Sequence, residues 1–86
     1  MDISKKINDN ILELKVSGRL DTTTAPELEG VIIENMIGDI NSMVMDIEKL
    51  DYISSAGLRI FLISQKMVDK LGGTLTVKKV KHEINK

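Results

Sequence analysis

The first part of the chain shows the alternation of apolar and polar residues that is typical of half-buried strands. Leu12, Leu14 and Val16 are each followed by a polar residue, which predicts a strand covered on one face. Residues 3–7 precede this strand, and the turn-rich residues 8–10 lie between the two segments. The N-terminal part of the chain is therefore expected to form a β-hairpin.

Helical spacing begins near Thr24. Thr24 and Glu27 stand at the spacing of a capping box, and Pro26 falls in the first turn, where its missing N–H is no loss. Apolar residues then recur at helical spacing until Gly38, which supplies a stop signal. We therefore expect a helix that starts at this segment and ends before Gly38.

The rest of the pattern predicts a strand, a second helix and a last strand. Residues 43–47 are apolar except for Asp46, which predicts a central strand buried on both faces. Helical spacing resumes after the serine pair and ends at Gly72, and residues 74–77 then alternate like a strand. The expected buried face of the second helix consists of Leu58, Phe61, Leu62, Gln65, Val68 and Leu71.

The resulting order of elements is β-β-α-β-α-β, which indicates an α/β fold. Right-handed β-α-β crossovers that add strands in one direction place both helices on the same face of the sheet. We therefore expect a mixed sheet of about four strands, antiparallel in the N-terminal hairpin and parallel elsewhere. No linker or repeat divides residues 1–86, so we expect a single domain.

Composition limits the functions that this chain can have. Only Tyr52 and Phe61 are aromatic among 86 residues, which argues against a stacking platform for single-stranded nucleic acid. The net charge is −1, although residues 78–86 carry four lysines and one glutamate. We interpret this basic tail as solvated surface and expect no direct nucleic-acid binding.

The residues needed for catalysis or metal binding are scarce. The chain has no cysteine and one histidine, His82, and it contains neither a phosphate-binding glycine loop nor a nucleophile elbow. Asp46, Glu48 and Asp51 are either paired acids or the acidic rim of a solvated loop. We expect no enzyme activity, no metal and no cofactor.

With no apolar leader and no membrane-length run, we also expect a cytoplasmic protein without a membrane anchor.

Ser54 and Ser55 stand immediately before the second helix. A hydroxyl at this place can accept a hydrogen bond from a free first-turn N–H, so one interpretation is a helix cap. A phosphate would also be tolerated here, where it would stabilise the helix by about 0.3–1 kcal/mol. The same phosphate could cost several kcal/mol against a partner surface shaped for a neutral hydroxyl. Residue spacing alone leaves both interpretations open.

Three segments give the chain a family resemblance. "GRLDTTTAPELE" (residues 18–29), "MDIEKLDYISSAGLRIFL" (residues 45–62) and "GGTLTV" (residues 72–77) occur in this order. At these separations they resemble a STAS domain of the bacterial anti-sigma factor antagonist type. The resemblance implies a STAS-like sheet and a switch protein that regulates sigma-factor-dependent transcription.

The resemblance also implies partners and a phosphorylation site. Such antagonists bind an anti-sigma factor that is also a serine kinase, are released when it phosphorylates them, and are reset by a phosphatase. The family's phosphoacceptor stands two residues before the glycine of "S-x-G-L", which is Ser55 here. Many members have an aspartate directly before it, whereas this chain has Ser54, so Ser54 is the alternative acceptor.

The family's "G-x-L-D" pattern ends at Asp21 in this chain. The resemblance implies that Asp21 lies beside the phosphoacceptor and contacts the kinase; the alternative is an aspartate that caps a turn. The partner-binding surface expected from the resemblance comprises Asp21, Ser54, Ser55, Ala56, Gly57 and Arg59.

One departure concerns length, because the family usually continues into further C-terminal helices, which are missing or shortened in residues 1–86. Uncovered apolar surface and a free sheet edge would favour a homodimer.

Two other functions stay open. One is a STAS interaction module of a transport or signalling complex without a phospho-switch; the other is a small ligand-binding domain or hydrolase, which rests on fold analogy alone.

Overall fold

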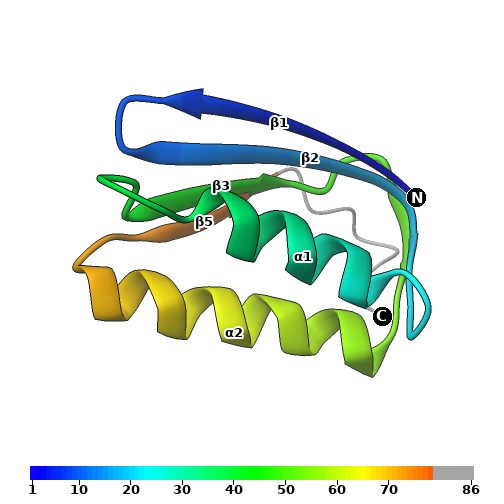
Figure 1. Ribbon diagram of the computed structural model, residues 1–86. Helices are drawn as coiled ribbons and strands as arrows, with labels where there is room; N and C mark the ends of the chain where they lie inside the picture. Colours follow the sequence, from blue (N-terminus) through cyan, green and yellow to red (C-terminus); the bar gives the residue numbers. More distant parts are fainter. Residues whose placement is uncertain (79–86) are drawn as a thin grey trace.

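The computed structural model of the chain describes residues 1–78 and arranges them as a twisted sheet with both helices on one face (Figure 1). The basic tail beyond Lys78, including His82, lies outside the described residues. In chain order the elements are β1 (Asp2–Asn8), β2 (Ile11–Leu20), α1 (Ala25–Asn35), β3 (Ser42–Asp46), β4 (Leu50–Ile53), α2 (Ser55–Leu71) and β5 (Leu75–Lys78).

The sheet has the predicted mixed topology. Its main path is β1-β2-β3-β5, with β1 antiparallel to β2 and the other neighbours parallel. The strand β4 is additional to the four that the sequence predicted, and it pairs in parallel with the last residues of β2. The sequence of β4 gives no clear strand pattern. Leu50 is buried in this strand, whereas Asp51 and Tyr52 are both exposed.

The strand β2 is long enough to pair with two partners in succession. Its first half pairs with β3, and after a register shift between Gly18 and Arg19 its end pairs with β4. Gly18 has a φ of +92°, which a residue without Cβ adopts readily. The Gly18 amide donates to the Lys49 carbonyl at 3.1 Å. This bend carries the end of β2 to the start of α2.

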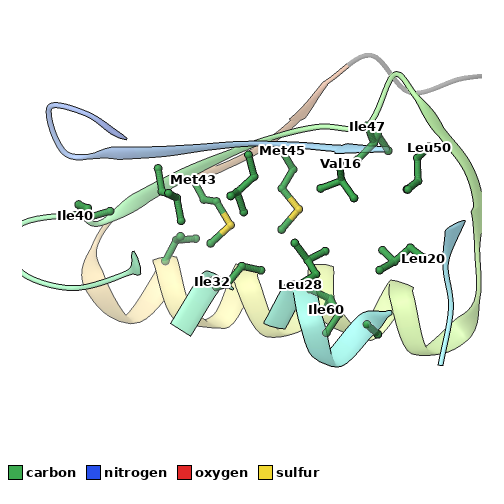
Figure 2. Packing of buried hydrophobic residues seen from close by; sticks show 14 residues of the cluster. Val16, Leu20, Leu28, Ile32, Ile40, Met43, Met45, Ile47, Leu50 and Ile60 are labelled. Carbon is green, nitrogen blue, oxygen red and sulfur yellow. The ribbon is translucent and has the colours of Figure 1, made fainter. Parts of the chain in front are cut away.

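The core lies between the helices and one face of the sheet (Figure 2). Met43 and Met45 of β3 point toward the helices and are fully buried, whereas Val44 on the opposite face is half-buried. The prediction of a strand buried on both faces was therefore wrong. Since both helices cover the same face, none among residues 1–78 covers the side where Val44 lies. The other buried apolar residues are Leu12, Leu14, Val16, Leu20, Ala25, Leu28, Ile32, Ile40, Ile47, Leu50, Ile60 and Val68.

Helix α1 begins where the sequence predicted, but the predicted capping contacts are not formed. Helix α1 begins at Ala25 with Pro26 in the first turn, but the Thr24 side chain makes no capping bond to the helix. Its Oγ1 instead lies 2.7 Å from the Arg19 carbonyl oxygen, to which it donates. The capping box with Glu27 is therefore not formed, because the Thr24 hydroxyl is used in the turn that precedes the helix.

The buried face of α2 differs from the predicted one. Leu58 and Leu62 are 54% and 66% exposed, and of the predicted face only Val68 is buried. The actual buried face combines Val68 with Ile60 and two small residues, Gly57 and Ser64. Small residues let a helix lie close to the sheet. A prediction of the buried face from hydrophobicity alone therefore selected the wrong side of α2. The predicted stop is confirmed, since Gly72 ends α2 with a φ of +75°.

Candidate functional site at the start of helix α2

Ser54 caps helix α2. Its backbone is extended (φ −88°, ψ 175°), and its hydroxyl accepts a hydrogen bond from the Gly57 amide at 3.3 Å. The Ser54 amide donates to the Leu20 carbonyl at 2.9 Å, which ties the cap to the end of β2. The sequence left open which of the two serines caps the helix, and the structure assigns the cap to Ser54, the extended residue before the helix.

Ser55 is the first residue of α2, and it is exposed. Its hydroxyl forms no hydrogen bond with any residue of the described range 1–78. The two serines thus divide two roles between them. Ser54 supplies the cap that a helix start needs, and Ser55 presents an accessible hydroxyl that the fold does not use.

Asp21 builds the turn that follows β2. Its Oδ1 accepts from the Thr23 amide (3.0 Å) and hydroxyl (2.7 Å) and from the Thr24 amide (3.1 Å), while the Thr24 hydroxyl lies 3.2 Å away. These donors, the Thr23 hydroxyl first, lower the pKa of Asp21 from 3.8 to about 2. The turn-capping interpretation of Asp21 is therefore correct, and Asp21 is anionic at neutral pH.

The structure brings Asp21 and the serine pair to one end of the molecule. Leu20 and Ile53 pair at the ends of the parallel strands β2 and β4, so Asp21 and Ser54 both follow at the same edge. The Ser54 amide bonds to the carbonyl of Leu20, the residue before Asp21, and Figure 1 shows the loop before α1 and the first turn of α2 at the same end of the molecule.

Close packing fixes this arrangement. A Cβ on Gly57 would lie 2.7 Å from Leu20 Cγ and 3.0 Å from the Leu20 carbonyl oxygen. Gly57 is therefore a packing residue of the site rather than an exposed contact, and Ala56 beside it is half-buried. Of the predicted surface, Ser55 and Arg59 are the exposed members.

Arg19 and Tyr52 form a pair that the sequence did not reveal. They are register neighbours on β2 and β4, and the Arg19 guanidinium lies 4.3 Å from the centre of the Tyr52 ring. Arg19 Nε is also 3.7 Å from Asp21 Oδ2. The signal was hidden because β4 had no recognisable strand pattern, so nothing placed Tyr52 opposite Arg19.

The other polar candidates lie away from this site. Asp46 Oδ1 accepts from the Glu48 amide at 3.1 Å, so Asp46 shapes the turn after β3. Two hollows of about 360 and 290 Å³ on the open face of the sheet share Ser4, Lys15 and Asp46, and neither is lined by residues 54–59. Within residues 1–78 no three potential metal ligands come together, and no helix has the length and apolarity needed to span a bilayer.

Known proteins resemble this chain in sequence and in fold. The anti-sigma-B factor antagonist of Staphylococcus aureus (strain NCTC 8325 / PS 47) is 30% identical over 70 residues, which are 81% of this chain. The chain spans 65% of that relative's length.

Two solved structures share the fold. An anti-sigma factor antagonist from Mycobacterium paratuberculosis superposes with a TM-score of 0.75 at 24% identity, over 90% of this chain and 67% of the other. The phosphorylated form of the Bacillus cell fate determinant SpoIIAA gives 0.81 at 13% identity, over 95% and 76%. The sequence profile of the STAS domain matches residues 2–86, and the chain therefore belongs to the STAS domain family.

Proposed function

We propose that residues 1–86 act as one STAS domain of the anti-sigma factor antagonist type. In its unmodified form the protein binds an anti-sigma factor that is also a serine kinase, which frees a sigma factor for transcription. Phosphorylation of Ser55 ends the interaction, and a phosphatase restores it. With these partners the protein would act in the cytoplasm. The observation that carries the proposal is the exposed Ser55 hydroxyl, which the fold leaves unbonded beside the Asp21 turn.

In the proposed reaction this chain is the substrate that accepts a phosphoryl group from ATP. The Ser55 oxygen attacks the γ-phosphorus of ATP held by the kinase, so an O–P bond forms while the bond from the γ-phosphorus to the β–γ bridging oxygen breaks. ADP leaves, and the hydroxyl proton passes to a base of the kinase. The phosphatase later transfers the phosphoryl group to water. In this scheme the chain itself catalyses nothing.

The division of roles between the serines favours Ser55 as the acceptor. Transfer to Ser54 would use the oxygen that accepts from the Gly57 amide, so modification would disturb the helix cap. Transfer to Ser55 leaves that bond intact. The first turn of α2 has no acidic residue, so a phosphate there meets no like charge in its own turn and interacts favourably with the helix dipole.

The effect of phosphorylation is therefore expected at the partner surface. On the fold, the phosphate contributes about 0.3–1 kcal/mol of stabilisation. A partner that fits a neutral hydroxyl and carries acidic groups loses several kcal/mol through like-charge contact and lost fit. Because the second effect is larger and opposite in sign, the modification switches binding without unfolding the protein.

The test is phosphate mapping with matched variants. The wild type, Ser55→Ala and Ser54→Ala are each incubated with ATP and the anti-sigma factor kinases of the source organism, and the products are mapped by mass spectrometry. We expect phosphate on Ser55 in the wild type and in Ser54→Ala, and none in Ser55→Ala. Binding of a partner without any transfer to Ser55 would instead indicate a STAS interaction module without a phospho-switch.

A further inference from the structure

Arg59 stands one helical turn after Ser55 on α2. The helix is continuous over Ser55–Leu71, so residues four positions apart lie on the same side, with about 5–6 Å between their Cβ atoms. Both side chains are exposed, on the side of the helix away from the buried residues Gly57 and Ile60. Helical side chains lean toward the N-terminus, so the Arg59 side chain leans toward Ser55.

Arg59 is uncommitted in the unmodified protein. Within residues 1–78 it forms no ion pair and no hydrogen bond. The other arginine of this region, Arg19, is held between Asp21 and Tyr52. Arg59 is therefore a cation that a new anion at Ser55 could engage without breaking an existing contact.

We propose that Arg59 is the intramolecular counter-ion of the phosphate on Ser55. This inference rests on the proposed function, because it concerns the phosphorylated form. A guanidinium can donate two parallel hydrogen bonds to phosphate oxygens, and an acid placed N-terminal to a cation at this spacing is the favourable order in a helix. Phosphorylation thus removes two features from the partner surface together, the neutral hydroxyl of Ser55 and the free cation of Arg59.

The other charged groups near this end do not duplicate that role. Lys66 also faces outward on α2 but lies about 16 Å further along the axis, which is beyond the reach of the phosphate. Asp51 on β4 and Asp21 after β2 are anions, and Arg19 is already engaged by Asp21. Among residues 54–71 Arg59 is thus the cation that helical geometry places beside Ser55.

The experiment uses phosphoserine installed at position 55 during translation, so no kinase is needed. The second pKa of the phosphate, ordinarily near 6, is measured by ³¹P NMR in proteins with Arg59, Arg59→Gln, Arg59→Lys and Lys66→Gln. Because a neighbouring cation favours the dianion, we expect Arg59→Gln to raise this pKa by about 0.5. Arg59→Lys should raise it less, and Lys66→Gln should leave it unchanged. The difference should shrink in about 1 M salt.

Equal phosphate pKa values in the Arg59 protein and in Arg59→Gln would overturn the inference, and so would an equal rise in Lys66→Gln. Circular dichroism of each variant verifies that α2 is intact, which is expected because Arg59 is exposed and unbonded. Since the phosphate is installed without a kinase, this outcome is independent of the phosphate mapping. A failed mapping would remove the proposed function, whereas a failed titration would remove only the role of Arg59.

Discussion

Gly57→Ala tests whether close packing between α2 and the end of β2 builds the site. The new Cβ would lie 2.7 Å from Leu20 Cγ, 3.0 Å from Leu20 Cδ2 and 3.0 Å from the Leu20 carbonyl oxygen. Contacts this short require a shift, and the backbone oxygen cannot move without disturbing the bond that the Ser54 amide donates to it. Overpacking of this kind costs about 1–3 kcal/mol.

Two opposing terms decide the sign of the effect. Replacing glycine by alanine within a helix gains up to about 1 kcal/mol, so we expect Gly57→Ala to destabilise the protein by up to about 2 kcal/mol. The matched control is Gly30→Ala in α1, where a new Cβ meets nothing within 4 Å. This control should gain about 1 kcal/mol, because only the propensity term acts.

Urea unfolding of both variants measures the difference. We expect the two alanine substitutions to change the free energy of unfolding in opposite directions, with an unchanged dependence on urea concentration. Gly57→Ala should also weaken partner binding, because the shift separates Ser55 from the Asp21 turn. If Gly57→Ala proved as stabilising as Gly30→Ala, the packing argument for this site would be wrong.

Ser54, Ser64 and Asp21 each provide a separate test of the local structure. Ser54→Ala should cost about 0.5–2 kcal/mol in thermal or urea unfolding, because it removes the cap, whereas Ser55→Ala should stay within about 0.5 kcal/mol of the wild type; equal losses would refute the division of roles. Ser64→Ala should leave the protein equally stable or about 1 kcal/mol more stable, since its buried hydroxyl has no hydrogen-bond partner in the described residues, and a clear loss in urea unfolding would contradict this. The stabilisation by Asp21 is fully present above its unfolded pKa of 3.8 and is lost as pH falls toward 2. Asp21→Asn should therefore be less stable than the wild type at pH 7, with a difference that disappears near pH 2 in acid titrations followed by circular dichroism; a constant difference would be the contrary result.

Much of the fold was predictable because its signals are local. The alternation of Leu12, Leu14 and Val16 correctly located β2 and the face that it buries. The Gly72 stop was also predictable, since a left-handed helix end favours glycine. The strand β4 was not, because its pairing with β2 depends on a bend at Gly18 and not on any pattern of its own.

The relative position of the candidate site residues was predictable, but the local role of each serine was not. The resemblance located Asp21 and Ser55 at one site, and the structure brings them to the same end of the molecule. Spacing alone could not tell which serine caps α2, since that depends on where the extended backbone ends and the helix begins. The exposure of Leu58 was unpredictable for a similar reason, because the lack of a side chain at Gly57 lets that face of α2 pack against Leu20.

The most direct test of the central claim is the affinity of the partner for the two forms of the protein. The anti-sigma factor captured by the unmodified protein is titrated calorimetrically against protein carrying serine or phosphoserine at position 55. A loss of several kcal/mol predicts an affinity at least about 100-fold weaker for the phosphorylated form, with identical far-ultraviolet circular dichroism spectra for the two. Equal affinities for the two forms would contradict the switch at Ser55.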